Sequence, residues 1–202
     1  MTQILAIDKI INLLIILTFL FFIPSKMISA QHILITYYSL DGHTEKMASA
    51  VAEGAQISGK SLVRLRTIRQ TDHDDLLWAD AIIVGSPVHV GNVAAPVQQF
   101  ISQWPFDQQE LKNKIGAAFT TGGGISAGEE LTQLNILHSM LVHQMIIIGG
   151  PSWSQPFGAS AVTGEDPFTD NSEGPSVNEM FIKKGNALGQ RVAEIARKMD
   201  CQ

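Results

Sequence analysis

A short polar run stands where an apolar, strand-like segment gives way to a segment with helical spacing. The run is SLDGHT, Ser39 to Thr44, between HILITYY and TEKMASAVAEG. The first turn of a helix leaves backbone N–H groups without partners and carries partial positive charge. Ser39 and Thr44 add hydroxyls there, and Gly42 permits a tight turn. The run favours a phosphate monoester held on a helix N-terminus, although a plain capped turn explains this loop equally well by itself.

Two more loops follow apolar runs further along the chain. The first is SPVHVGN, residues 86–92, and the second is TTGGGISAGEE, which begins at Thr120. Gly122 to Gly124 would let a flat ring lie against the backbone, and Thr120 and Thr121 supply hydroxyls. Neither loop carries the GK[ST] of a Walker loop, and neither has the position of a dinucleotide fingerprint. One phosphate loop and two ring-sized loops indicate a mononucleotide with a large flat head.

Composition excludes several other classes of function. The net charge of −5 and the scattered basic residues argue against a nucleic-acid partner. One cysteine, Cys201, excludes an internal disulfide and a CxxC site. The six histidines are scattered and no HExxH is present, so no metal site is expected.

The first thirty residues differ from the rest of the chain. The uncharged run from Ile10 to Ile23 is short for a spanning helix but fits the core of a signal peptide, and small residues ending at Ala30 follow it. We therefore expect residues 1–30 to be a signal peptide or an N-terminal membrane anchor, with a periplasmic or membrane-anchored protein. Alternatively, Met27 is the true start, and the protein is cytoplasmic.

Residues 31–202 alternate between strand-like and helix-like segments. The expected strands cover residues 32–38, 61–68, 80–86, 114–120 and 145–149. The expected helices cover residues 44–59, 72–79, 94–104 and 127–144, and a last helix buries Phe181, Leu188, Val192, Ile195 and Met199. A loop is expected over residues 150–175. Continuous apolar strands need cover on both faces, so the pattern predicts one three-layer, doubly wound α/β domain with a five-stranded parallel sheet.

Several segments, in order, resemble the flavodoxin-like NAD(P)H:quinone oxidoreductases of the Trp-repressor-binding-protein (WrbA-like) family. They are YYSLDGHTEKMASAVAEGA, ADAIIVGSPVHVGN, KIGAAFTTGGG, LVHQMIIIG and FGASAVTGED, and the resemblance extends from about Ile33 to Met199. It implies a flavodoxin-like fold, bound FMN, and two-electron reduction of a small-molecule quinone with NADH or NADPH as co-substrate. Residues 31–202 would then form a flavodoxin-like FMN-binding domain.

The resemblance also implies roles for individual residues. His143 matches a histidine near the flavin and nicotinamide and is the catalytic candidate, while Trp104 or Phe106 would border the substrate pocket. The residues expected to bind FMN are Ser39, Leu40, Asp41, Gly42, His43, Thr44, Ser86, Pro87, Val88, His89, Val90, Gly91, Asn92, Thr120, Thr121, Gly122, Gly123 and Gly124.

The chain departs from the family pattern at two places in these loops. Asp41 replaces an aromatic residue that touches the nicotinamide, and His89-Val90 replace Arg-Phe. The negative charge of Asp41 bears on the use of a phosphate-rich donor more than on FMN binding. A flavodoxin-type electron carrier and a cofactor-free binding module are therefore the alternatives. A homo-oligomer, dimer or tetramer, is expected, and membrane proximity would come from the N-terminal segment.

Overall fold

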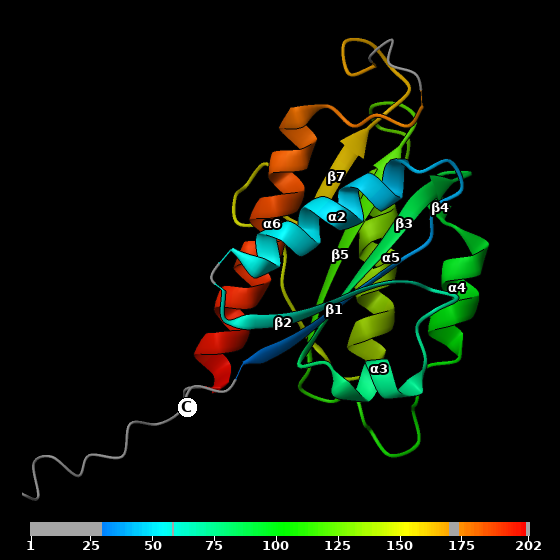
Figure 1. Ribbon diagram of the computed structural model, residues 1–202. Helices are drawn as coiled ribbons and strands as arrows, with labels where there is room; N and C mark the ends of the chain where they lie inside the picture. The colour runs from blue at the N-terminus through cyan, green and yellow to red at the C-terminus, as the bar shows by residue number, and fades with distance from the viewer. Residues whose placement is uncertain (1–29, 58, 170–173, 201–202) are drawn as a thin grey trace, which may run out of the picture.

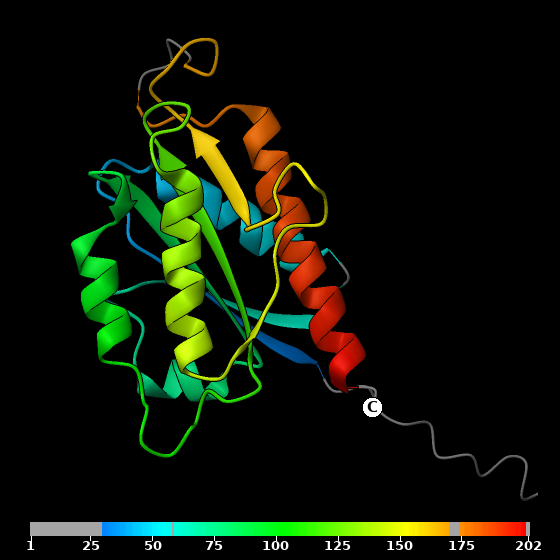
Figure 2. The ribbon, with the colours of Figure 1, turned by 180° about the vertical axis from the view of Figure 1, so that it is seen from behind.

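The computed structural model describes residues 30–57, 59–169 and 174–200. They form one three-layer α/β domain with a central sheet (Figures 1 and 2). The expectation of a signal peptide or anchor falls almost entirely on residues outside these ranges. Within the described ranges, no helix combines the length and apolar character needed to cross a membrane.

Four parallel strands form the centre of the sheet. They are β1 (Gln31–Tyr37), β2 (Ser61–Thr67), β3 (Ala81–His89) and β5 (Ile115–Gly122), in the spatial order β2-β1-β3-β5. The chain order reverses beside β1, as a doubly wound sheet requires. Below, the edge where β1, β3 and β5 end is called the carboxyl edge, and the edge where they begin is called the amino edge.

The fifth strand position is divided between two short strands. β6 (Ile146–Ile147) pairs with the start of β5, and β7 (Ala159–Val162) pairs with its end, both in parallel. The prediction of a buried strand over residues 145–149 was therefore too long, and the predicted loop contains β7. Between them lie Pro151 and Pro156, which lack the N–H that ladder pairing needs.

Helices cover both faces of the sheet. α2 (His43–Gln56) and α6 (Glu179–Asp200) lie on one face. α3 (His73–Trp78), α4 (Ala95–Ser102) and α5 (Glu129–Val142) lie on the other, which Figure 2 brings forward. α2 and α6 approach closely, because a Cβ added at Gly54 or Gly189 would lie 1.9 Å from a carbonyl oxygen of the facing helix.

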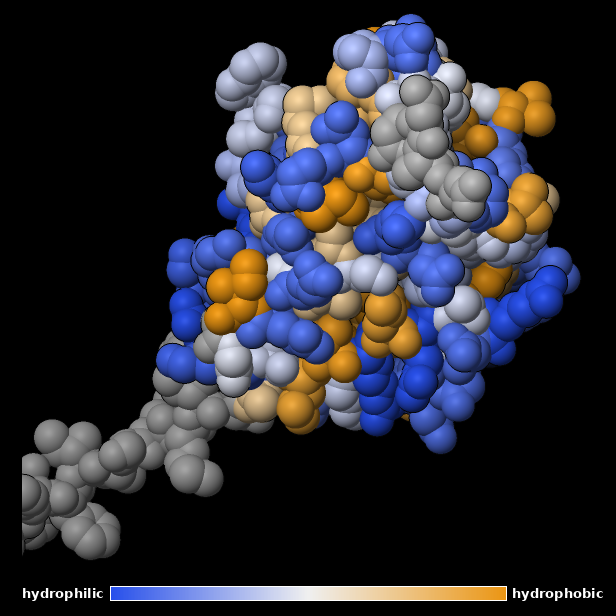
Figure 3. Space-filling view, turned by 45° about the horizontal axis from the view of Figure 1, so that its top comes forward, coloured by the Kyte–Doolittle hydropathy of each residue, from blue (hydrophilic) through white to orange (hydrophobic). Residues whose placement is uncertain are grey.

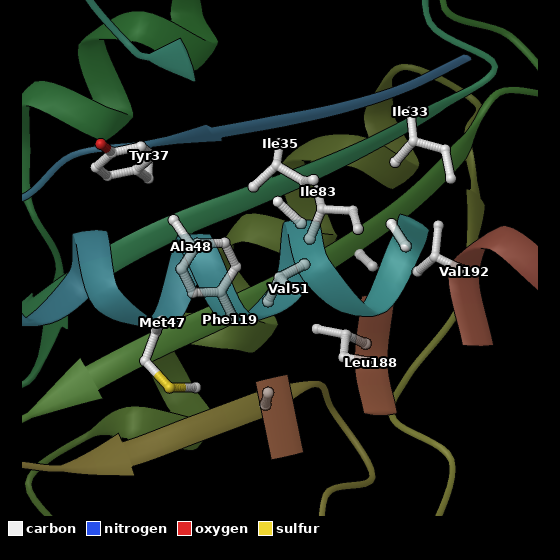
Figure 4. Close-up of a cluster of buried hydrophobic side chains, with 14 of the residues drawn as sticks. Ile33, Ile35, Tyr37, Met47, Ala48, Val51, Ile83, Phe119, Leu188 and Val192 are labelled. Atoms are coloured by element: carbon white, nitrogen blue, oxygen red, sulfur yellow. The ribbon is translucent and has the colours of Figure 1, made fainter. Parts of the chain in front are cut away.

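Each face has its own apolar core. On the α2 face, Met47 and Val51 meet Phe119 of β5 and Leu188 of α6, all fully buried (Figure 4). Continuous apolar strands are buried on both faces, as the sequence pattern predicted. The prediction for the last helix was wrong at its end, because Ile195 is only partly buried and Met199 is 38% exposed. α6 runs past the rim of the sheet there, so its final turn has less to pack against.

Candidate functional site

Three loops meet at the carboxyl edge, and each touches the other two. Loop 1 is residues 38–42, loop 2 is residues 86–92, and loop 3 is residues 120–128. The Oγ1 atoms of Thr44, just after loop 1, and Thr121 are hydrogen-bonded at 2.7 Å. The rings of Tyr38 and His89 meet edge to face, with centroids 6.2 Å apart. The backbones of Gly91 and Gly128 are so close that a Cβ on Gly128 would lie 2.6 Å from the Gly91 oxygen.

Loop 1 leads into α2, whose first turn has no side-chain cap. Gly42 is the N-cap residue in the left-handed conformation (φ 96°), and it accepts the first helical hydrogen bond, from Lys46 N–H, at 3.1 Å. Its own N–H donates to Ser39 Oγ at 3.0 Å. The N–H groups of Thr44 and Glu45 belong to the first turn, where a helix offers no internal acceptor. This end of α2 therefore fits an anion.

Asp41 and His43 are in contact at the same point. One Asp41 oxygen accepts a hydrogen bond from His43 N–H at 3.3 Å and lies 3.0 Å from Nδ1 of the His43 ring. Burial raises the pKa of Asp41, but the hydrogen bonds from His43 outweigh it and hold that pKa below its usual value. Asp41 is therefore ionised at neutral pH, beside the donors that a phosphate would use.

Loop 2 is a tight hairpin rather than an open loop. β3 continues to His89, turns through Val90 (φ 52°) and Gly91 (φ 71°), and pairs antiparallel with β4 (Asn92–Val93). The polar side chains at its ends are used internally. Ser86 Oγ accepts from Ala94 N–H at 3.1 Å, and Asn92 Oδ1 accepts from Asn135 Nδ2 at 2.7 Å. Ser86 and Asn92 thus shape the loop, while Pro87 to Gly91 lie between them.

Loop 3 leaves space for a ligand. A Cβ added to Gly123 would meet nothing within 4 Å. Thr120 Oγ1 is buried and has no hydrogen-bond partner among the described residues. Side chains alternate along β5, and Phe119 and Thr121 face α2, so this hydroxyl points to the α5 face of the sheet and not toward the α2 terminus. The space at loop 3 and the uncapped α2 terminus together fit a phosphorylated flat ligand.

Each loop also presents an exposed aliphatic side chain. Leu40 is 74% exposed, Val90 is 106% exposed and Ile125 is 57% exposed. Figure 3, with the carboxyl edge tilted forward, shows apolar surface interspersed with polar surface there. Val90 is also a β-branched residue at positive φ, which costs conformational energy and is typical of functional sites. Apolar groups gathered at a polar rim indicate a ligand or docking site.

Sequence reasoning missed three contributors to this edge. Tyr38 joins loop 1 to loop 2, Ile125 extends loop 3, and Glu165 accepts a hydrogen bond from Ile125 N–H at 2.6 Å. Ile125 follows the three glycines directly, so its position was a usable signal. Glu165 lies 40 residues away from Ile125 in sequence, and no local pattern connects the two.

The structure places His143, Trp104 and Phe106 together, but at the amino edge. The His143 ring lies 5.6 Å from the Trp104 ring and 5.5 Å from the Phe106 ring, between centroids. Burial lowers the pKa of His143, although a hydrogen bond with the Pro105 carbonyl works against it. Trp104 is buried, whereas Phe106 is 58% exposed.

α5 separates this aromatic cluster from the loops. Its N-cap Gly128 touches loop 2, and its C-cap is His143. Its 14 residues make it about 21 Å long. His143, at the C-terminal end of α5, therefore lies about one helix length from Gly128 of loop 3 in the same chain copy.

Comparison with known proteins first defines the class. The sequence profile described as "Flavodoxin domain" matches residues 34–143. A flavodoxin, WrbA-like protein from Agrobacterium tumefaciens superposes with a TM-score of 0.67 at 23% identity, covering 83% of this chain and 98% of the other. A flavodoxin from the domain Archaea superposes with a TM-score of 0.61 at 22% identity, covering 83% and 99%. The fold is that of the flavodoxins.

Curated relatives identify the family within the flavodoxin fold. A protein from Sinorhizobium fredii named NAD(P)H dehydrogenase (quinone) is 33% identical over 83% of this chain and 98% of its own length. One of the same name from Chromohalobacter salexigens is 31% identical, with the same coverage. The chain belongs to the flavodoxin-like NAD(P)H:quinone oxidoreductase (WrbA-like) family. It is an oxidoreductase of the flavin-dependent class.

Proposed function

We propose that the chain binds FMN and passes a hydride from NAD(P)H to a quinone. The observation that carries this proposal is the three mutually contacting loops at one edge, with an uncapped helix terminus beside them. Names of the curated relatives support the activity, because each is an NAD(P)H dehydrogenase (quinone). FMN, when bound, supplies the hydride-transfer chemistry itself.

The protein's own residues would bind and orient the reactants. The N–H groups of Thr44 and Glu45, with the Ser39 hydroxyl, would hold the phosphate. Loop 3 would lie along the ring, where its close backbone favours a flat group. Leu40, Val90 and Ile125 would exclude water from the exposed face of the site and offer a quinone an apolar surface. No side chain of the three loops need form a bond to substrate.

Binding of the phosphate and of the ring can be tested separately. Substituting Thr44→Val removes a hydroxyl that bonds Thr121, and Ser39→Ala removes a hydroxyl at the cradle. We expect the double variant to bind FMN at least tenfold more weakly, because the phosphate loses the Ser39 hydroxyl and the first turn of α2 loses its hydrogen bond to loop 3, while riboflavin affinity changes less. Fluorescence titration measures both affinities. Ser49→Ala, on the exposed side of α2, is the control.

Turnover tests the remainder of the proposal. Purified protein loaded with FMN should bleach at 450 nm on addition of NADH or NADPH and recover its colour with a soluble benzoquinone. Protein that binds no FMN, or that bleaches with neither donor, would overturn the proposed activity.

The charge of Asp41 favours a second candidate, a flavodoxin-type electron carrier with weak NAD(P)H activity. Asp41 is ionised, and its side chain is 63% exposed beside the cradle. A carboxylate there repels the phosphates of a nicotinamide donor. Asp41→Asn should lower the KM for NADPH if the donor binds at this edge. An unchanged KM, together with slow bleaching in both proteins, would favour the electron carrier.

We further propose that a homo-oligomer brings the amino-edge cluster to the site of a neighbouring copy. The family resemblance assigns His143 and an aromatic residue to the flavin site, yet one chain copy holds them about one α5 length away. A second copy could supply His143 and the exposed Phe106, whereas buried Trp104 could not reach a neighbour. Neutral His143 would keep its one N–H on the Pro105 carbonyl, and its other ring nitrogen would accept a hydrogen bond from the reduced quinone.

Subunit mixing tests this arrangement. His143→Ala and the Ser39→Ala, Thr44→Val double variant would each be weakly active alone. Unfolding, mixing and refolding them together should restore part of the parent activity, because some sites then combine intact loops with an intact His143. A monomer in analytical ultracentrifugation, or no gain on mixing, would exclude shared sites.

The N-terminal segment is proposed to direct export or to anchor the chain. β1 begins at the amino edge, so the three loops lie at the opposite edge of the sheet from the start of β1. Cell fractionation of the full chain and of a chain starting at Met27 separates the two possibilities. A full chain found only in the cytosol would favour the Met27 start.

A further inference from the structure

Glu165 is tied to loop 3 from outside the three loops. Its Oε2 accepts the N–H of Ile125 at 2.6 Å, a short distance that is typical of charge-assisted hydrogen bonds. The same oxygen lies so close to Gly124 that an added Cβ there would be 2.9 Å away. Glu165 therefore contacts loop 3 at two consecutive residues, next to the open space beside Gly123.

The segment that carries Glu165 is itself held in place. β7 pairs with β5 up to Val162 and Gly122, and the next two N–H groups continue this ladder. Thr163 donates to Gly122 O and Gly164 to Gly123 O, each at 2.9 Å. Glu165 is thus the next residue after an extended backbone contact with loop 3.

A turn then connects Glu165 to the core. Phe168 N–H donates to Glu165 O at 2.9 Å. The Phe168 ring packs on Phe181 of α6, with centroids 5.1 Å apart. Because Phe181 is buried in the α2–α6 core, this turn anchors the backbone of Glu165.

We propose that Glu165 is a positioning residue that holds loop 3 ready for the flavin ring and places a negative charge beside it. The proposal rests on FMN binding at this edge. The hydrogen bond fixes the Ile125 backbone, so binding would not have to order loop 3. The charge disfavours added electron density on the ring, which lowers the midpoint potential of the bound flavin.

Two substitutions separate the hydrogen bond from the charge. Glu165→Gln keeps an acceptor for Ile125 N–H but removes the charge, whereas Glu165→Ala removes both. Glu165 is exposed, so neither change threatens the fold. Glu53→Gln, at an exposed position further along α2, is the control for loss of one negative charge.

The measurements are flavin affinity and midpoint potential. Glu165→Ala should weaken FMN and riboflavin by the same factor, about tenfold for one charge-assisted hydrogen bond, because the defect concerns the ring rather than the phosphate. Glu165→Gln should bind both flavins within about twofold of the parent, and its potential should rise by an amount that shrinks with added salt. Glu53→Gln should change neither quantity.

The outcomes distinguish this proposal from the function on which it rests. If Glu165→Ala binds both flavins like the parent, Glu165 has no positioning role. If Glu165→Gln leaves the potential unchanged, Glu165 places no effective charge beside the ring. FMN binding stands in both cases. If Glu165→Ala weakens FMN but not riboflavin, its action on the ring is excluded. If the parent protein binds neither flavin, the proposed function fails and this inference fails with it.

Discussion

The carboxyl edge and the amino edge of the sheet differ in how the elements that meet there are joined. At the carboxyl edge, backbone approaches such as Gly91 to Gly128 join the loops, the first turn of α2 has no side-chain cap, and aliphatic side chains stay exposed. At the amino edge, Lys114 Nζ donates to the carbonyls of Leu77 and Ala79, and Asn113 N–H donates to Gln144 O at 3.1 Å. The carboxyl edge thus leaves helix N–H groups for a ligand, whereas these hydrogen bonds at the amino edge tie the ends of neighbouring elements together.

This difference indicates where substitutions should affect binding and where they should affect stability alone. Strain and unsatisfied groups are costly, so they persist where a function retains them. Satisfied hydrogen bonds at a helix end contribute to folding without a ligand.

Gly128→Ala should have the largest effect, because it separates loops 2 and 3. The added Cβ would lie 2.6 Å from Gly91 O, at a φ of 111° that favours glycine. We expect a loss of about 3 kcal/mol in the free energy of unfolding and loss of FMN binding. Urea unfolding and fluorescence titration measure the two effects.

Gly59→Ala is the matched control. Gly59 also has positive φ (64°), but its added Cβ would meet nothing within 4 Å. Gly59→Ala should lower the free energy of unfolding by about 1 kcal/mol and leave FMN affinity unchanged. Equal losses in the two variants would show that backbone strain, rather than the meeting of the loops, determines the effect.

Lys114→Met tests the amino edge. It leaves the carbonyls of Leu77 and Ala79 to water, and we expect about 1–2 kcal/mol of destabilisation in urea unfolding. FMN affinity should match the parent. Lys112→Met, at an exposed neighbouring position, should be nearly neutral. Weakened FMN binding by Lys114→Met would contradict the division of roles between the two edges.

Val90→Asn should raise the stability of the fold and weaken quinone binding. Asparagine tolerates the positive φ of residue 90 better than valine does, so we expect the free energy of unfolding to rise by about 1 kcal/mol. The exposed aliphatic surface is lost, so quinone KM should rise several-fold. Leu40→Asn removes a comparable side chain without relieving a left-handed backbone, and it should show the KM effect alone. Unchanged stability in Val90→Asn would mean that the turn carries no strain.

The smallest expected effect concerns pH and His143. Burial lowers its folded pKa below the unfolded value of about 6.5, so the unfolded chain binds the proton first as pH falls. Stability should therefore decrease as pH falls through about 6.5, and His143→Gln should reduce this slope. Urea unfolding between pH 5 and 8 measures the slope. An identical slope in both proteins would contradict the assigned direction.

The sequence predicted most of the fold because its signals were local. Apolar runs at residues 33–35 and 82–84 required cover on both faces, and the structure confirms a doubly wound parallel sheet. The break in the fifth strand was missed, because an apolar run with flanking prolines does not show how far pairing extends.

For the site, the sequence by itself determined which segments supply loops 1, 2 and 3, although it ended two strands too early, because β3 continues to His89 and β5 to Gly122. It also determined the helix that starts after loop 1. Only the tertiary structure decided which residues meet. It brought Glu165 to Ile125, 40 residues away, and it placed His143 about one α5 length from the loops. The physical reason is that a sequence pattern has the range of a few residues, whereas distance across a sheet is determined by the length and direction of the packed elements.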